Sequence, residues 1–275
     1  MKNPPAILGE IAEKTLLRVT KAKEALQPEQ AQKQALALAE KEKTSGENAK
    51  LLPFENSISI PGLSFICEVK KASPSKGIIA QDFPWLEIAK DYEEGGASAI
   101  SVLTEPDFFL GSDQYLREIS SAVQIPVLRK DFIIDPYQIY EAKLWGAKAV
   151  LLICALLEKE TLSSYIAIAK DLALDCLVEI HSEQEAEDAV KSGARIIGIN
   201  NRDLTTFNVD TKLTALLRKL IPADTLTVAE SGIKTADDIC VIKETGVDAV
   251  LIGESLMRST DRKQFLWELI EATVN

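Results

Sequence analysis

The chain has 275 residues, of which 46% are hydrophobic, enough for one large core or two ordinary ones. Its 42 acidic and 31 basic residues give a net charge of −11 and a pI near 4.8, which argues against nucleic acid or an anionic membrane as a partner. The longest apolar run, residues 149–157, is too short to cross a bilayer, and the N-terminus lacks the apolar core of a secretory signal.

The four cysteines lie in apolar runs without a Cys-x-x-Cys pair. We interpret them as small core residues of a cytoplasmic protein rather than as disulfides or zinc ligands. The one histidine, His181, argues against a serine–histidine triad and against a multi-histidine metal site. We expect it to be a surface residue at a strand end.

The N-terminal segment, residues 1–62, is predicted to be a helical extension. Residues 5–26 carry apolar groups near a 3.6-residue period, which predicts an amphipathic helix that Pro28 ends. Residues 29–43 are helical by propensity, and residues 47–63, with two prolines, are predicted to be an extended connection. The extension could close the bottom of the following domain or form a lid over its mouth.

A repeat of about 50 residues predicts the fold of residues 63–275. Four similar segments begin with glycines spaced 50, 47 and 53 residues apart, at Gly96, Gly146, Gly193 and Gly246. Each glycine follows a helical pattern and precedes an apolar run, as a glycine that ends a helix before a strand does.

Four further apolar runs lie between these segments, at residues 65–70, 127–130, 176–180 and 226–230. Eight strands alternating with helices predict a parallel sheet, and a four-fold repeat of two strand–helix units predicts an α/β fold of the (β/α)8 TIM-barrel type. An open doubly wound sheet is the lesser alternative, because it needs no four-fold repeat and no Gly-x-Gly-x-x-Gly turn follows the first strand.

The first strand ends with two charged residues on one face. Glu68 and Lys70 are two residues apart, so both side chains point toward the mouth, either as reactive groups or as a structural ion pair. The turn that follows holds Ser73 and Pro74 and could bind an anion.

The next three strands end in residues suited to a pocket. Phe109, in the loop after the second strand, packs on a helix or forms an aromatic wall. The third strand ends at Lys130, our candidate for proton chemistry, whose plainer alternative is a lysine pointing into water. Leu151, on the fourth strand, is interpreted as barrel interior that could also line a pocket.

The last four strands end in a carboxylate, a guanidinium and two glycine-containing loops. The fifth strand ends near Glu179, and Arg202 after the sixth could bind a carboxylate or pair with a neighbouring aspartate. Loops after strands seven and eight of such barrels commonly bind phosphate. Here they contain Ser231, Gly232, Gly253 and Ser255, while the charge of Glu254 must point away.

Five segments, in order and together, resemble the indole-3-glycerol phosphate synthase family: residues 68–75, 128–132, 198–204, 229–232 and 253–257. The resemblance runs from about residue 5 to the C-terminus. It implies a carboxy-lyase of tryptophan biosynthesis. The expected reaction converts 1-(2-carboxyphenylamino)-1-deoxyribulose 5-phosphate to indole-3-glycerol phosphate by ring closure, decarboxylation and dehydration.

The resemblance also implies roles for single residues. Lys130 is expected to be the general acid that polarises the substrate ketone, and Glu179 the base for dehydration. Glu68 and Asn200 are expected to orient these groups, while Lys70 meets the phosphate or shares the acid role. Arg202 is expected to contact the anthranilate carboxylate. The phosphate side is expected to comprise Ser73, Ser231, Gly232, Gly253 and Ser255, and the ring pocket Pro74, Phe109, Phe132 and Leu151.

The same chemistry needs no cofactor and no metal, so we expect neither, and we expect a phosphorylated small molecule as the only obligatory partner. Whether neighbouring lysines lower the pKa of Lys130 or glutamates raise it stays open at this point. Alternatives are a phosphoribosylanthranilate isomerase-like barrel, a Schiff-base aldolase, and an inactive barrel that binds a protein.

Overall fold

Eight parallel strands form a closed barrel in the computed structural model, which describes residues 5–44 and 53–273. Around the barrel each strand pairs with its neighbours in the chain, and the first closes on the last. The predicted (β/α)8 fold is therefore confirmed, and the open sheet is wrong. The strands are β1 (Ser64–Val69), β4 (Ala99–Leu103), β5 (Val127–Lys130), β6 (Ala149–Ile153), β7 (Asp175–Ile180), β8 (Ile196–Asn200), β9 (Leu226–Glu230) and β10 (Ala249–Ile252).

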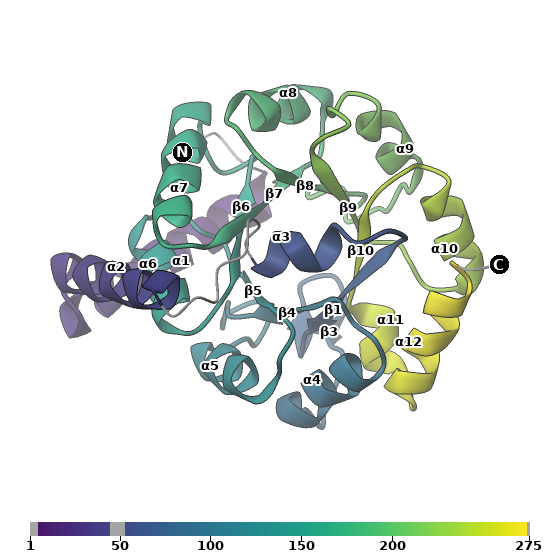
Figure 1. Cartoon of the computed structure of the whole chain (residues 1–275), viewed down its shortest axis with the longest axis horizontal. Coiled ribbons are helices and arrows are strands. Elements are labelled where there is room, and N and C mark those ends of the chain that lie inside the picture. Colours follow the sequence, from purple (N-terminus) through teal and green to yellow (C-terminus); the bar gives the residue numbers. More distant parts are fainter. Residues whose placement is uncertain (1–4, 45–52, 274–275) are drawn as a thin grey trace.

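Helices surround the barrel as an outer ring (Figure 1). The four repeat glycines all have positive φ, between 75° and 98°, and each lies between a helix and the next strand. The ring consists of α4 (Trp85–Glu94), α5 (Asp113–Ala122), α6 (Tyr137–Leu144), α7 (Lys159–Asp171), α8 (Glu183–Lys191), α9 (Lys212–Arg218), α10 (Ala236–Lys243) and α12 (Arg262–Glu271), with the short α11 (Glu254–Arg258) after β10.

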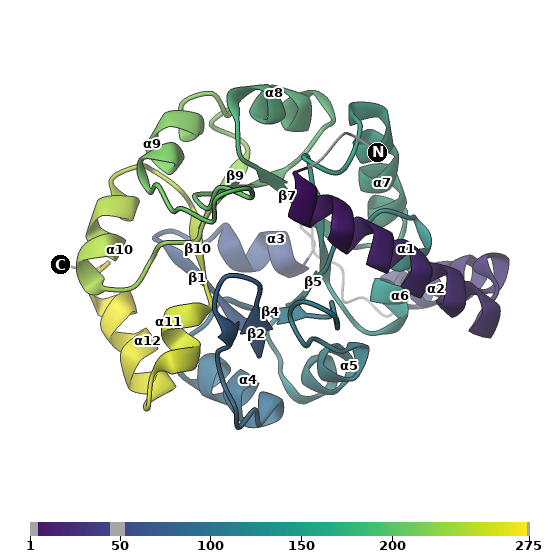
Figure 2. The same cartoon turned by 180° about the vertical axis from the view of Figure 1, so that it is seen from behind.

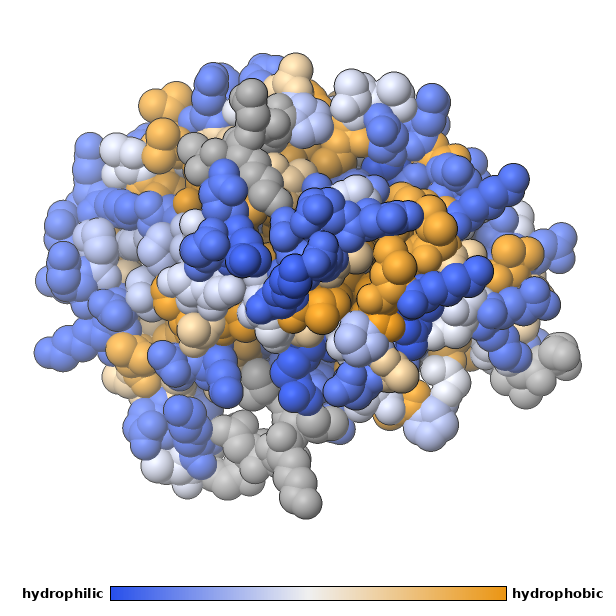
Figure 3. Space-filling model, turned by 90° about the horizontal axis from the view of Figure 1, so that it is seen from above, coloured by the Kyte–Doolittle hydropathy of each residue, from blue (hydrophilic) through white to orange (hydrophobic). Residues whose placement is uncertain are grey.

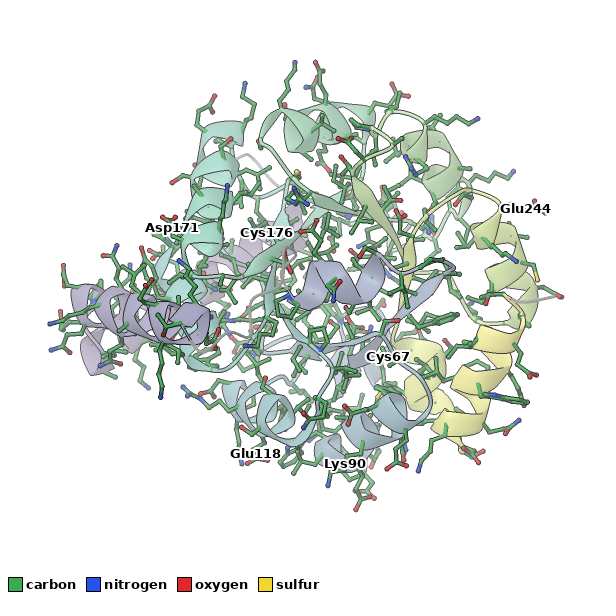
Figure 4. The ribbon with its side chains drawn as sticks, in the orientation of Figure 1. Cys67, Lys90, Glu118, Asp171, Cys176 and Glu244 are labelled. Carbon is green, nitrogen blue, oxygen red and sulfur yellow. The ribbon has the colours of Figure 1, made fainter. Side chains whose placement is uncertain are left out.

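The core fills the barrel and the layer between strands and helices. Five of the strands are buried along their whole length, as expected of parallel strands covered on both faces. Charged residues such as Lys90 and Glu244 lie at the outer edge of the ring, whereas Cys67 lies inside it (Figure 4). Seen from the edge, the surface is mostly hydrophilic with smaller hydrophobic areas (Figure 3).

The N-terminal helices reach both ends of the barrel. Helix α1 (Ala6–Ala25) crosses the end where the strands finish (Figure 2), and α2 (Pro28–Thr44) packs beside α6. Helix α3 (Pro53–Ile58) crosses the opposite end (Figure 1). Helices of the extension thus lie at both ends of the barrel, and a role as a lid stays a prediction.

Helix α3 corrects the predicted extended connection over residues 47–63, of which residues 47–52 lie outside the described part. Its first residue, Pro53, suits the first turn of a helix, and Phe54 and Ile58 are fully buried. The backbone N–H of Glu55 donates to Asp175 at the start of β7 (2.8 Å). Tertiary contacts, rather than local periodicity, stabilise this six-residue helix.

Two smaller expectations also need correction. Cys240 is exposed on α10 and Cys176 is only partly buried, so only Cys67 and Cys154 are core residues. His181 is largely covered rather than a surface residue, with 14% of its side chain exposed. Within residues 5–44 and 53–273, no helix has the length and apolar character needed to cross a membrane.

Candidate active site

One cavity of about 720 Å³ opens where the strands end. Its walls come from the barrel strands, the loops after them and α1. All fifteen residues singled out from the sequence lie in these walls, although their chemical roles stay predictions. They are Glu68, Lys70, Ser73, Pro74, Phe109, Lys130, Phe132, Leu151, Glu179, Asn200, Arg202, Ser231, Gly232, Gly253 and Ser255.

The cavity floor holds a cluster of buried charges centred on Lys130. Its ammonium nitrogen lies 3.4 Å from Glu179 Oε2 and 3.3 Å from Glu230 Oε2. Beside them, Lys70 forms an ion pair with Glu68. Three carboxylates therefore share two ammonium groups in a space largely closed to water, where charge–charge interactions are strong.

These carboxylates decide the protonation state of Lys130. Burial alone would lower the pKa of the ammonium, but the charges of Glu230, Glu179 and Glu68 outweigh burial and raise that pKa well above its usual value. The raised pKa favours the charged ammonium form of Lys130, which can donate a proton.

Glu179 and Glu230 face the same ammonium but differ in acidity. Burial favours the neutral form of Glu179, yet Lys130, His181 and hydrogen bonds lower its pKa below the usual value. Burial raises the pKa of Glu230 to about 8, since the attraction of Lys130 does not compensate for it. The pKa values of the two carboxyl groups are thus shifted in opposite directions, so Glu179 ionises first and Glu230 keeps a proton to higher pH. Such a division between neighbouring carboxyl groups is typical of acid–base sites.

Asn200 connects the base to the loops on the other side of the cavity. Its side chain hydrogen-bonds to Glu179. Its Oδ1 accepts from Ser231 Oγ at 2.9 Å and from the backbone N–H of Arg202 at 3.1 Å. This geometry fixes the amide so that its nitrogen faces the carboxylate.

Sequence reasoning missed Glu230 as a site residue. The signal was present, because Glu230 ends β9 after an apolar run much as Glu179 does near the end of β7. Space for its carboxyl group comes from Gly198, since a Cβ at that position would collide with Glu230 Oε1. The glycine in β8 is thus required by packing.

The loops after β9 and β10 form the side of the cavity with exposed backbone. Ser231 and Gly232 both have positive φ, 67° and 90°, and a Cβ on Gly232 would lie 2.6 Å from Val209. Glu254 Oε1 lies 3.2 Å from Arg258 and 3.9 Å from Lys76, so cations neutralise the acidic residue that looked unfavourable for phosphate. Lys76, Lys234 and Arg258 also line the cavity.

The opposite side is apolar. The rings of Phe109 and Phe132 lie 5.8 Å apart with an interplanar angle of 38°. Leu151 lies at the floor, and Leu8 and Ile11 of α1 close the wall from above. A flat aromatic group fits between such surfaces.

Helix α1 is held over the cavity by an ion pair between half-buried Arg18 and buried Asp131. Arg18 donates to Asp131 at 2.7 Å and to the backbone oxygen of Thr104 at 3.1 Å. Asp131 also pairs with Arg129 at 2.9 Å, and these two cations hold the pKa of the carboxyl far below its usual range, against the effect of burial. Asp131, next to Lys130, thus has a structural role.

Arg202 does not form the salt bridge to a neighbouring aspartate that the sequence offered as one alternative. Its guanidinium donates to the backbone oxygen of Phe207 at 3.2 Å, within its own loop, rather than pairing with Asp203 or Asp210. Its backbone pairs with Val209 in an isolated bridge. The side chain stays in the cavity wall, where it can receive a ligand carboxylate.

Comparison with known proteins agrees with this architecture. The family described as "Indole-3-glycerol phosphate synthase" matches residues 10–269. A protein of that name from Ruminiclostridium cellulolyticum is 54% identical over 255 residues, covering 93% of this chain and 95% of that protein. One from Endomicrobium trichonymphae is 52% identical over 263 residues, covering 96% and 99%. A 3-hexulose-6-phosphate synthase structure, 14% identical, covers 76% of this chain and 99% of its own with a TM-score of 0.62, which shows the fold alone.

Proposed function

Because the chain belongs to the indole-3-glycerol phosphate synthase family, we propose a division of catalytic work among the residues of its cavity. The chain is a carboxy-lyase of tryptophan biosynthesis. It forms indole-3-glycerol phosphate from 1-(2-carboxyphenylamino)-1-deoxyribulose 5-phosphate, with loss of CO2 and water. The observation that carries the proposal is the approach of Lys130 Nζ to Glu179 Oε2, at 3.4 Å, in a cavity with one apolar and one glycine-rich side.

Lys130 acts first, as the acid in ring closure. Its ammonium hydrogen-bonds to the ketone oxygen and transfers a proton as the aromatic carbon attacks and the alkoxide develops. The alkoxide is basic enough to take this proton even from a lysine whose pKa is raised. General acid catalysis of this kind is worth on the order of 10²–10⁴-fold.

Glu179 acts later, as the base in dehydration. It is ionised at neutral pH and fixed by Asn200, so it can accept the proton whose loss, with departure of the hydroxyl group as water, completes the pyrrole ring of the indole. Glu230, whose pKa is raised to about 8, keeps a proton to higher pH than Glu179 does. Glu68 pairs with Lys70 and holds it close to Gly253. A Cβ atom added to Gly253 would lie 3.1 Å from Lys70 Nζ. This position supports a role for Lys70 near the phosphate or in the acid step.

The two sides of the cavity orient the substrate. The phosphate lies against the loops of Ser231, Gly232, Gly253 and Ser255, with Ser73 across from them. The aromatic ring lies between Phe109, Phe132, Pro74 and Leu151, with its carboxylate toward Arg202. Holding the aromatic ring and the ketone in contact favours ring closure, because alignment of two reactants can lower the activation free energy by up to roughly 7–11 kcal/mol relative to free reactants.

The N-terminal segment, residues 1–62, completes the proposal as an extension whose α1 shields the cavity from water. We also propose a cytoplasmic location, which rests on the biosynthetic role of the family, and no obligatory protein partner. The isomerase and aldolase alternatives find no observation in their favour.

An indole-fluorescence assay tests these roles. We expect Lys130→Ala and Glu179→Gln each to lower kcat by about 10²–10⁴-fold with a nearly unchanged KM. Asp113→Asn, an exposed change on α5 outside the cavity, serves as the matched control and should retain full activity. Near-normal turnover in both cavity variants would refute the assigned roles.

A further inference from the structure

The only histidine of the chain lies directly behind the proposed base. His181 follows β7 two residues after Glu179, so the two side chains leave the strand on the same side. His181 Nε2 lies 3.5 Å from Glu179 Oε1, while the other oxygen of that carboxylate faces Lys130. The base is therefore placed between an ammonium group and an imidazole.

A second carboxylate lies on the far side of the imidazole. His181 Nδ1 lies 3.5 Å from Glu185 Oε2, and the same oxygen accepts the backbone N–H of His181 at 2.7 Å. Glu185 belongs to the first turn of α8, whose packing brings it over the end of β7. The three side chains form a row: carboxylate, imidazole, carboxylate.

The row is buried but not fully hydrogen-bonded. Both ring nitrogens are inaccessible to water, and neither has a well-aligned hydrogen-bond partner within residues 5–44 and 53–273. Leaving buried polar groups unsatisfied costs roughly 1–3 kcal/mol each, so a purely space-filling role would favour an apolar side chain here. A small rotation of the ring would complete contacts to both carboxylates, as apo active sites often require.

Four acidic groups interact electrostatically with the imidazole. They are Glu179 on β7, Glu185 on α8, Glu230 on β9 and Asp203 after β8. Burial lowers the pKa of His181, but contact with Glu185 and the charges of the other carboxylates outweigh it and raise the pKa above its usual 6.5. The imidazole thus favours its protonated form, with two N–H donors for two carboxylates.

We propose that His181 is a positioning residue for Glu179, which it orients toward the substrate and keeps ionised through a contact that Glu185 secures from the other side. His181 is absent from the cavity wall, so it acts through Glu179 and not on the substrate. This inference rests on the proposed role of Glu179 as the base.

The presence of one histidine makes a direct test possible, by NMR titration of a histidine-labelled protein. We expect a single imidazole titration with a midpoint above 6.5, and Glu185→Gln should lower this midpoint. Glu183→Gln, which removes an exposed charge from the same turn of α8, should leave it nearly unchanged. A midpoint at or below 6.5, or one that ignores Glu185→Gln, would overturn the proposal.

Kinetics separate positioning from a structural role. In His181→Asn, loss of the positive charge should move the acidic limb of the kcat–pH profile to higher pH and lower kcat about tenfold, with little change in KM. Glu185→Gln should shift the limb in the wild-type background but not in His181→Asn. A His181→Asn profile that superposes on the wild-type profile would contradict the proposal. If Glu179→Gln is fully active, the role of the base fails instead, so the two failures are distinguishable.

Discussion

Replacing Glu230 by glutamine should remove part of the pH dependence of the free energy of unfolding. Glutamine keeps the shape of a protonated glutamate but cannot ionise. In the folded chain, burial raises the pKa of Glu230 to about 8 from an ordinary value of 4.5. Between these values the folded chain holds a proton that the unfolded chain has lost, so stability is highest at low pH and falls as pH rises.

The magnitude follows from this difference. Each pH unit between 4.5 and 8 costs the wild-type chain about 1.4 kcal/mol, which gives at most about 4 kcal/mol between pH 5 and pH 8. Because Glu179 and Lys130 share the titration, we expect about 2–4 kcal/mol. Glu230→Gln is free of this cost, so its stability relative to wild type should grow with pH.

Urea denaturation at pH 5 and pH 8 measures the effect, and activity is measured in parallel. Asp175→Asn is the matched control, because burial raises the pKa of Asp175 to about 7 at the opposite end of the barrel. Both variants should gain stability relative to wild type as pH rises. A constant difference in stability between Glu230→Gln and wild type at the two pH values would refute the raised pKa of Glu230.

Three further substitutions have defined outcomes. Arg18→Ala removes one of two cations on the buried Asp131. It should lower the free energy of unfolding at pH 7 by about 1–3 kcal/mol and raise KM through looser α1. Asp131 has a depressed pKa, so this loss should shrink as pH falls below about 4, as urea titrations would show. Gly198→Ala should displace the Glu230 carboxyl group and lower kcat at least about tenfold, as steady-state kinetics would show. Gly253→Ala places a methyl group against the Lys70 ion pair and should lower kcat/KM more than stability, which parallel denaturation and kinetic measurements would separate.

The fold could be predicted because the signal repeats. Four helix-ending glycines with apolar runs between them leave few arrangements other than a closed barrel. The site could be predicted because side chains at the ends of parallel strands must meet at one end of the barrel. Lys130 and Glu179 are 49 residues apart in sequence, yet strand geometry alone brings them to 3.4 Å.

What the sequence did not reveal depends on tertiary contacts. Helix α3 is too short for periodicity to show, and it is stabilised by burial of Phe54 and Ile58. The location of α1 over the mouth depends on the pairing of Arg18 with Asp131, which no local pattern indicates. Burial of His181 depends on Glu185 from the next helix, so a polar residue at a strand end was wrongly assigned to the surface.

Separate measurement of CO2 release and indole formation in one turnover tests the central claim most directly. If Lys130 closes the ring and Glu179 acts only in dehydration, Glu179→Gln should release CO2 in a burst well before indole fluorescence rises. Lys130→Met should slow both signals together, because decarboxylation follows ring closure. Simultaneous loss of both signals in Glu179→Gln, or an early burst of CO2 in Lys130→Met, would contradict this division of roles.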